Sequence, residues 1–429
     1  MSMEELKKLS IQQEEKKGSS SNMDDLLSFN SLVYSLPMVN SLVTRRSLQT
    51  YTFDSTSYNQ DSGQLTVVLN SGEQFLNFKN SYLQLDIAVT SSQNRSWDFG
   101  RGSALNLFET TEVVSRQGTV LSRNQQNNVY QIQEHKTKKS QEWFDSQGFI
   151  MGYNDIKAQG YAGYAHTAPV TVIIPLQYVN SLFDSQMLCP DSICSGARLI
   201  LSLERLNNAI RYIVPQGEQA TTGKGFTITN PKVVVDAHTL ADSAYKSLAL
   251  TGARNGLEYV VRAVHHESTP VTTNFNTSIS KSVARALEVV AVPRLDASIN
   301  DADADSLVTP TIAYTDFQIQ LGSHLLPQRK LEGNLPIYAN ILYSTDQFSD
   351  IDGRGSYLSQ EDFTTNGYGH LRQNLQTQSL LDLSGTSCNN SRQVRINGSM
   401  STGGAKTFDV FMSYMAVIRA FRTNVAVTS

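Results

Sequence analysis

Apolar residues occupy every second position in several short stretches, and this period of two restricts the fold of the chain more than any other feature. Residues 83–89 show the pattern, and residues 199–203 and 317–321 repeat it. Successive side chains of a β-strand point to opposite faces, so the pattern predicts strands with one buried face. Other runs are mostly apolar and rich in β-branched and aromatic residues, which favours buried strands: residues 170–174, 233–235, 287–292 and 408–421. The chain is therefore predicted to be an all-β protein of sandwich type.

The length of the chain and an internal repeat predict two such sandwiches. A chain of 429 residues is long for one domain and suits two domains of about 200 residues each. Residues 112–118 form a strand-like run that ends on glycine, reverses, and leads into a helix-compatible stretch at 125–143. Residues 316–322 also end on glycine and lead into a helix-compatible stretch at 336–343. One copy in each half predicts a duplicated β-sandwich.

These patterns predict four parts along the chain. An N-terminal arm with one or two short helices covers residues 1–44, and a first sandwich covers 45–240. A connector follows at 241–256, with a short helix expected from about residue 240, and a second sandwich covers 257–429. Four lysines and four glutamates cancel in the first 17 residues of the arm, whereas an arm that condenses a genome would be strongly basic.

The charge of the chain gives no general attraction to nucleic acid or to an anionic membrane. The net charge is −4, and charged residues make up 17% of the sequence, which is low for a soluble protein. Low charge is typical of chains that bury much of their surface against neighbours, and also of secreted β proteins. The first residues lack the apolar core of a signal peptide, so we expect a protein that is not secreted. The three cysteines are expected to be reduced structural thiols.

Catalytic motifs and metal-binding motifs do not stand out in the sequence. Residues 403–407 resemble a phosphate-binding loop, but the glycine pattern is incomplete, and a turn between strands is the better interpretation. Asp301, Asp303 and Asp305 alternate as in a calcium loop without its glycine and closing glutamate, which predicts a solvated acidic loop, with a weak cation site as the alternative. Residues 346–353 form a second acidic turn with the same interpretation.

The histidines and tryptophans also have simple interpretations. His265 and His266 are neighbours at the end of a predicted strand, so they point to opposite faces and are expected at a surface or interface. His135, with lysines at 136, 138 and 139, predicts a small solvated basic face on a helix, with contact to a genome or a minor protein as the alternative. Trp97 and Trp143 are expected to anchor packing. The sequence predicts no catalytic, cofactor-binding or metal-binding residue, and no cofactor.

Over most of residues 45–425 the chain resembles the double jelly-roll major capsid proteins of DNA viruses, a family that includes those of nucleocytoplasmic large DNA viruses, virophages and Polinton-like viruses. The order of the strands and their local patterns carry the resemblance. The residues concerned are an early strand at 78–85, paired late strands at 170–176 and 197–204, a crossover at 232–238 and 257–264, and a strand and glycine turn at 316–329. The turn reads Ile319-Gln320-Leu321-Gly322, without the extra residue that the family often has before this glycine.

The resemblance implies two tandem jelly-roll β-sandwiches with short helices in the connecting loops. It also implies a homotrimer that forms a pseudo-hexagonal capsomer in an icosahedral virion, assembled in the host cytoplasm or nucleus. The implied partners are neighbouring capsomers and minor capsid and penton proteins, with an inner membrane or the genome possible for the arm, and no small-molecule substrate. Loops at 216–225 and 346–368 are candidates for outward or inter-capsomer contacts. The alternatives are a β-sandwich attachment or binding module and a carbohydrate-active enzyme.

Overall fold

A computed structural model describes most of the chain from residue 43 onward. The described residues are 43–428 without 154–162, 167, 186, 216, 308–312, 348–356, 365–368, 377–384, 389–392, 402–405 and 422–424. The predicted arm therefore lies outside the described residues, apart from the two that begin the first strand. None of the described helices is long and apolar enough to cross a membrane.

Eight strands of the first half form two four-stranded layers, which we call the first roll. The first layer has the order β1 (Val43–Thr52), β11 (Gly225–Leu240), β4 (Phe75–Thr90), β8 (Val170–Pro175), and the short β2 (Ser57–Asn59) also pairs with β11. The second layer has the order β3 (Gln64–Leu69), β9 (Ala197–Leu203), β6 (Phe108–Val114), β7 (Val120–Gln125).

Eight strands of the second half form two further layers, which we call the second roll. Its first layer has the order β12 (Leu257–Val271), β19 (Lys406–Ala420), β14 (Ala286–Leu295), β17 (Leu371–Asn374), and β20 (Val425–Thr428) pairs with β19. Its second layer has the order β13 (Asn274–Ile279), β18 (Val394–Met400), β15 (Tyr314–Leu321), β16 (His324–Glu332).

The two rolls have the same topology. When the eight layer strands of each roll are numbered in chain order, one layer reads 1-8-3-6 and the other reads 2-7-4-5, in both rolls. This is the strand order of a jelly roll, in which the first and last strands are neighbours. Two tandem jelly rolls are therefore present, and the predicted fold class is confirmed.

The repeated hairpin that the sequence predicted lies at equivalent places in the two rolls. β6 and β7 pair across a turn, and α3 (Asn127–Lys138) follows; β15 and β16 pair across a turn, and α9 (Asn334–Ser344) follows. Both turns contain a glycine with positive φ, 91° at Gly118 and 59° at Gly322, a conformation that costs glycine little.

Short helices and strands occupy the connections. The predicted connector contains α8 (Asp242–Asn255), which is longer than expected. The predicted helix at 125–143 is interrupted, because α3 ends at Lys138 and α4 (Gln141–Trp143) begins after a break. The other short elements are β5 (Trp97–Asp98), η1 (Ala104–Leu107), η2 (Phe144–Gly148), α5 (Leu176–Val179), η3 (Ser181–Phe183), α6 (Asp191–Cys194), α7 (Leu206–Ala209), β10 (Arg211–Tyr212) and α10 (Gln360–Thr364).

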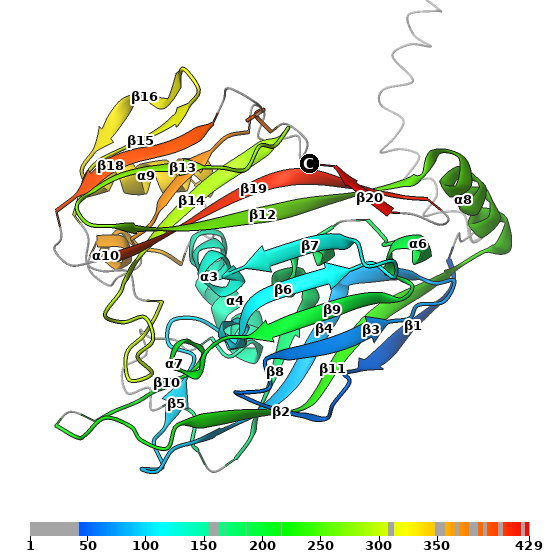
Figure 1. Cartoon of the computed structure of the whole chain (residues 1–429), viewed down its shortest axis with the longest axis horizontal. Coiled ribbons are helices and arrows are strands. Elements are labelled where there is room, and N and C mark those ends of the chain that lie inside the picture. Colours follow the sequence, from blue (N-terminus) through cyan, green and yellow to red (C-terminus); the bar gives the residue numbers. More distant parts are fainter. Residues whose placement is uncertain are drawn as a thin grey trace, which may run out of the picture. The chain divides into compact units, whose positions relative to one another are not determined.

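Three long connections of the first roll, and two of the second, lie at the same end of the strands. β4 is antiparallel to both β8 and β11, so the loops 91–107, 126–169 and 204–224 meet at one end of the first roll. The short loops 70–74 and 115–119 lie at the other end, together with the longer connection 176–196. In the second roll, loops 296–313 and 333–370 correspond to the long set. Figure 1 shows α3, α4, β5 and β10 of the first roll, with α10 of the second, toward one side, and α6 and α8 toward the other. We call the first side the long-loop end.

Each roll has an apolar interior, and the interior of the first roll is continuous with the outside of the second. In β4, the alternating residues at 83, 85, 87 and 89 are all buried, as their period of two predicted. The core cluster of the first roll also contains Tyr259, Val290 and Phe411, which belong to strands of the second roll. A separate cluster fills the second roll and contains Val289, the neighbour of Val290. The layer β12-β19-β14-β17 is therefore buried on both of its faces.

Candidate functional site

The contact between the two rolls combines aromatic packing with buried ion pairs. α3 of the first roll lies on the outer face of the layer β12-β19-β14-β17, and the edge strand β7 lies along β12. The ring of Tyr130 in α3 packs against Phe411 of β19 at 5.5 Å between centroids. We call these contacts of α3 and β7 with the second roll the roll interface.

Buried charges hold the roll interface together. Glu134 lies one helical turn after Tyr130, on the same face of α3. Arg372 of β17 donates to one oxygen of Glu134, and Lys138 donates to the other at 2.7 Å. Arg372 also lies 2.8 Å from Glu288 of β14, which accepts from Arg262 of β12 at 2.7 Å. Carboxylates and cations from three strands and one helix thus form a single network.

The network keeps its charges although it is buried. Burial alone would raise the pKa of Glu134, but the charges of Arg372 and Lys138 together hold it well below its usual range. Burial also opposes the charge on Arg262, but Tyr130, Glu134 and Glu288 raise its pKa. Removing one member of such a network leaves its partner as a buried, uncompensated charge, which is costly.

A cavity of about 470 Å³ lies beside the roll interface, between α3, β4 and β12. Two carboxylates line it, those of Glu134 and Asp184, together with Lys79, Lys138 and Arg262. Both oxygens of Glu134 are already occupied by cations, which suits a structural carboxylate better than a catalytic one. Among the described residues no group of three or more His, Cys, Asp or Glu side chains could hold a metal ion.

The predicted solvated basic face around His135 is wrong. His135 and Lys136 are each only 1% exposed. The ammonium of Lys136 lies over the rings of Phe144 and Tyr357, at 4.4 and 3.9 Å from their centroids. Backbone bonds from Tyr357 and Leu358 to α3 join the long loop of the second roll to this helix. Packing between two loops that are far apart in sequence therefore buries the end of α3.

The predicted solvated acidic loop is also wrong for two of its three aspartates. Asp303 accepts a hydrogen bond from the backbone of Thr221 at 3.0 Å and pairs with Lys224 at 3.1 Å. Asp305 is buried and accepts from the backbone of Arg101 at 3.0 Å, and its burial raises its pKa. The loop therefore joins the second roll to the first at the long-loop end.

The structure also tests the predictions for the two neighbouring histidines, the two tryptophans and the cysteines. β12 continues to Val271, so His265 and His266 lie within the strand and not at its end. Their side chains diverge as predicted: His265 contacts Glu267, and His266 contacts Asp409. Trp97 is fully buried. Trp143 packs against His135 and Phe144. The three cysteines are buried, free thiols.

Several predictions concern residues that the structure covers in part. Most of the acidic turn at 346–353 and of the phosphate-loop lookalike at 403–407 lies outside the described residues. Lys406 and Thr407 are the exceptions in the second, and they begin β19. The loop 216–225 belongs to the long-loop end, where Arg95 pairs with Glu218 and Lys224 with Asp303. The described parts of 346–368 include Tyr357 and α10, at the same end.

The sequence analysis did not single out four charged residues of the roll interface: Glu134, Arg262, Glu288 and Arg372. Arg262 and Glu288 each lie inside an apolar strand, where a lone charge signals either a buried partner or an interface. Glu134 and Arg372 gave no comparable signal, because most of their neighbours are polar.

Comparison with solved structures identifies the class of fold: it is the double jelly roll of viral major capsid proteins. The sequence itself matches no protein-family model, and a search of curated proteins gives no significant match.

Three solved structures illustrate the likeness. A chain of the PBCV-1 virus capsid is 10% identical with a TM-score of 0.61, and the alignment covers 92% of this chain and 98% of that one. The Faustovirus major capsid protein is 9% identical with a TM-score of 0.59, covering 92% and 93%. The mavirus major capsid protein is 13% identical with a TM-score of 0.55, covering 92% of each chain. The likeness extends over both rolls.

Proposed function

We propose that this chain is a viral major capsid protein whose homotrimer forms a pseudo-hexagonal capsomer of an icosahedral shell. The observation that carries the proposal is the identical strand order of two tandem rolls, joined by a buried ion-pair network. Two similar rolls joined by buried contacts allow three chains to present six similar edges, which is what a six-sided tile needs. The likeness to solved capsid proteins over 92% of the chain supports this.

The parts of the chain are proposed to divide this task. The first roll is assigned to residues 45–240, the connector to 241–256 and the second roll to 257–429. The long-loop end, which includes residues 216–225, is proposed to make outward or inter-capsomer contacts, because loops can vary while the layers stay constant. Residues 1–44 are proposed as an arm that contacts other chains of the virion. Minor capsid and penton proteins are the proposed further partners.

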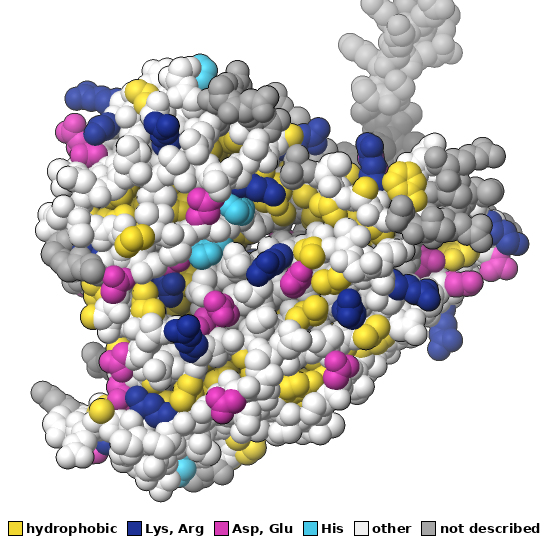
Figure 2. All heavy atoms as spheres, in the orientation of Figure 1, with side chains coloured by type: hydrophobic (Ala, Val, Ile, Leu, Met, Phe, Trp, Pro, Cys, Tyr) yellow, Lys and Arg dark blue, Asp and Glu magenta, His cyan; other side chains and the backbone are white. Residues whose placement is uncertain are grey.

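A structural role suits the surface and the cavity better than an enzymatic one. A carbohydrate-active enzyme needs two available carboxylates in its cleft. In the cavity beside the roll interface, Glu134 is engaged by Arg372 and Lys138. On the face seen in Figure 2, acidic and basic side chains are interspersed, without a basic patch suited to nucleic acid. We therefore propose that the protein is not an enzyme and is located in the virion.

Sizing of the purified full chain tests this proposal. Light scattering coupled to size-exclusion chromatography should give about three times the chain mass of 47.4 kDa. Negative-stain microscopy should show particles with a hexagonal outline. A stable monomer with the correct fold would contradict the proposal and favour a binding module or an enzyme.

A further inference from the structure

The cavity beside the roll interface is richer in positive charge than the chain as a whole. Among the described residues, four cationic side chains and two carboxylates line it: Lys79, Lys138, Lys139 and Arg262, with Glu134 and Asp184. The whole chain has the opposite balance, with 35 lysines and arginines against 39 aspartates and glutamates. The lining therefore has an excess of two positive charges in a protein whose net charge is negative.

The ion pairs of the roll interface do not remove this excess. Glu134 accepts from Lys138 in the lining and from the fully buried Arg372 behind it. Arg372 also lies 2.8 Å from Glu288, and Arg262 donates to the same carboxylate at 2.7 Å. The network thus contains three cations and two carboxylates, so one of its positive charges has no carboxylate of its own.

Lys79 and Lys139 supply the other positive charges of the lining, and Asp184 opposes them. Lys139 is half-buried, and its ammonium lies over the rings of Trp143 and Tyr178, 5.8 and 6.0 Å from their centroids. Burial lowers the pKa of Lys139, because water solvates its charge incompletely. Aromatic rings attract an ammonium but carry no net charge. A bound anion would supply the missing negative charge.

A buried nitrogen in the same lining lacks a hydrogen-bond partner. Nε2 of His135 makes no hydrogen bond within the described part of the chain, and the residue is 1% exposed. The other ring nitrogen, Nδ1, lies 2.8 Å from the hydroxyl of Tyr153. A phenol is a stronger acid than a neutral imidazole, so we assign the hydroxyl as the donor, which leaves the ring proton on Nε2. An N–H group without an acceptor favours a ligand that carries acceptor oxygens.

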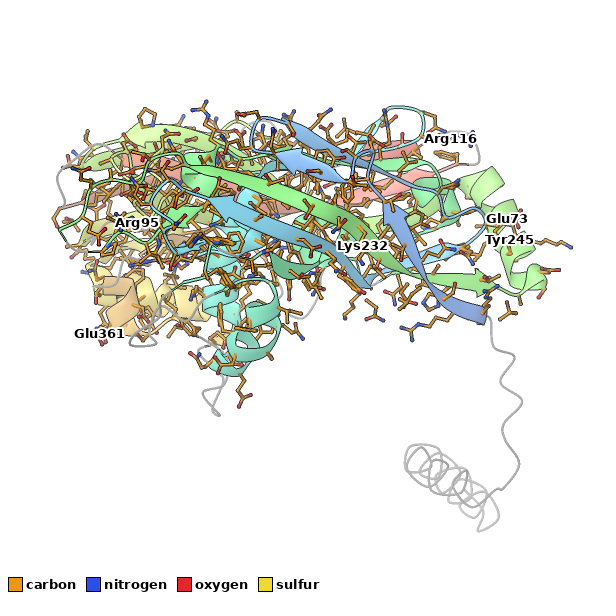
Figure 3. All side chains as sticks on the ribbon, turned by 90° about the horizontal axis from the view of Figure 1, so that it is seen from below. Glu73, Arg95, Arg116, Lys232, Tyr245 and Glu361 are labelled. Atoms are coloured by element: carbon orange, nitrogen blue, oxygen red, sulfur yellow. The ribbon has the colours of Figure 1, made fainter. Side chains whose placement is uncertain are left out.

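The size and position of the cavity suit a small organic molecule with an anionic group. Its volume of about 470 Å³ lies within the range of about 300–1,000 Å³ that is usual for small-molecule pockets. Lys79 belongs to β4, whereas Lys138 and Lys139 lie at the end of α3, which projects to one side of β4 and β11 in Figure 3. Ammonium groups are compact point charges that bind phosphate, and a phosphate monoester carries about two negative charges at pH 7. That charge matches the excess in the lining.

We propose that this cavity binds a small organic phosphate, whose phosphate group lies between Lys79 and Lys139. Arg262 and Lys138 add positive charge from the side of the roll interface. The inference goes beyond the proposed function, because the site lies within one chain and needs neither a trimer nor a capsid. A ligand held there contacts α3 of the first roll and β12 of the second, so it adds to the contacts between the rolls.

Titration of the purified full chain with inorganic phosphate, followed by phosphorus NMR at constant ionic strength, tests the proposal. Lys139→Met should weaken phosphate binding about 10-fold, because methionine keeps the packing on the rings but removes the charge. Lys139→Arg keeps the charge and should retain most of the affinity. Lys281→Met is the matched control, since that ammonium also lies over a ring, 5.7 Å from the centroid of Tyr414, but outside this cavity. The control should bind phosphate like the unmodified chain.

Two further measurements separate a binding site from a structural cluster of charges. Asp184→Asn removes a carboxylate from the lining and should strengthen phosphate binding roughly 3- to 10-fold, an effect that a purely structural role would not produce. Glycerol 3-phosphate should compete with inorganic phosphate for the site, whereas glycerol should not. Circular dichroism checks the fold of each variant, and the exposed Lys79→Met replaces Lys139→Met if the latter unfolds, with the same expectation.

The results that overturn this inference leave the proposed function untouched. If the unmodified chain binds no phosphate at tens of millimolar, or if Lys139→Met and Lys281→Met bind it equally, the cavity is not a phosphate site. Unchanged affinity in Asp184→Asn, or competition by glycerol alone, also overturns the inference. A monomeric chain that binds phosphate as expected would instead contradict the capsid role and leave the site in place.

Discussion

Arg372 in the second roll and Glu134 in the first form an ion pair in which the arginine side chain is fully buried and the carboxylate is 12% exposed. The two residues are 238 positions apart in sequence. Together with Glu288 and Arg262, this pair holds the two rolls in one position relative to each other.

The first prediction concerns this pair. Arg372→Met should lower the free energy of unfolding by about 3–5 kcal/mol, because Glu134 and Glu288 would then be buried with fewer cations. Urea unfolding followed by circular dichroism measures the loss. The control is the exposed pair of Arg419 and Glu258, whose side chains are 53% and 55% exposed, where Arg419→Met should cost less than about 1 kcal/mol. Equal losses at both sites would contradict the structural role of the buried network.

The second prediction concerns Gly100, where the first roll approaches a loop of the second. Gly100 has a φ of +60°, and a Cβ there would lie 2.6 Å from the carboxylate of Asp305. That carboxylate cannot easily move, because it accepts hydrogen bonds from the backbone of Arg101 and Leu307. Gly72 has the same φ of +60°, and no atom lies within 4 Å of an added Cβ. A substitution at Gly72 therefore measures only the free-energy cost of the left-handed backbone.

Gly72→Ala should therefore cost about 1–2 kcal/mol from the left-handed backbone alone. Gly100→Ala should cost roughly 1–3 kcal/mol more, because the methyl group overpacks the contact between the rolls. Thermal unfolding of both variants measures the difference. Similar losses would mean that the contact between residue 100 and Asp305 does not constrain the loop.

The third prediction concerns the thiols. Cys189, Cys194 and Cys388 are each less than 5% exposed, and burial raises the pKa of Cys189 well above its usual range. Buried, protonated thiols react slowly, so the native protein should resist a thiol reagent such as DTNB. Denaturation in guanidinium should release all three for reaction. Only one reactive thiol after denaturation would indicate a disulfide and contradict the free thiols of the structure.

Local patterns in the sequence predicted the strands and the repeated hairpin, whereas contacts between distant loops could not be predicted. The alternation at 83–89 needs only neighbouring residues to specify a strand. The burial of Lys136 depends on Tyr357, and that of Asp305 depends on Arg101, about 200 positions away in each case. A helix end or an acidic loop has the same sequence pattern whether a distant partner buries it or solvent surrounds it.

For the same reason, the sequence gives only a partial indication of the roll interface. Glu288 lies in the run Leu-Glu-Val-Val-Ala-Val, and a carboxylate in such a run needs a buried partner or an interface. The sequence does not say which cation provides it. Arg372 reaches Glu288 because β17 pairs with β14, a contact that forms only when the layer is complete.

The fourth prediction concerns His135 and the pH dependence of stability. Its ring lies between Trp143 and Tyr178, at 4.7 and 4.4 Å between centroids, and Nδ1 lies 2.8 Å from the hydroxyl of Tyr153. Burial, followed by the charge of Lys139, lowers the pKa of His135 to about 3. In the unfolded chain the pKa of a histidine is about 6.5.

Between these two values the unfolded chain binds a proton that the folded chain does not, so stability falls as the pH drops through 6.5 and stops falling near 3. At pH 5 the loss should be about 2 kcal/mol relative to pH 7. His135→Gln removes this titration while other groups contribute equally to both proteins. Urea unfolding of the two proteins at pH 7 and pH 5 should therefore show a smaller decrease for His135→Gln. An equal decrease in both would mean that His135 accepts a proton in the folded protein, and that the aromatic side chains around it open to water.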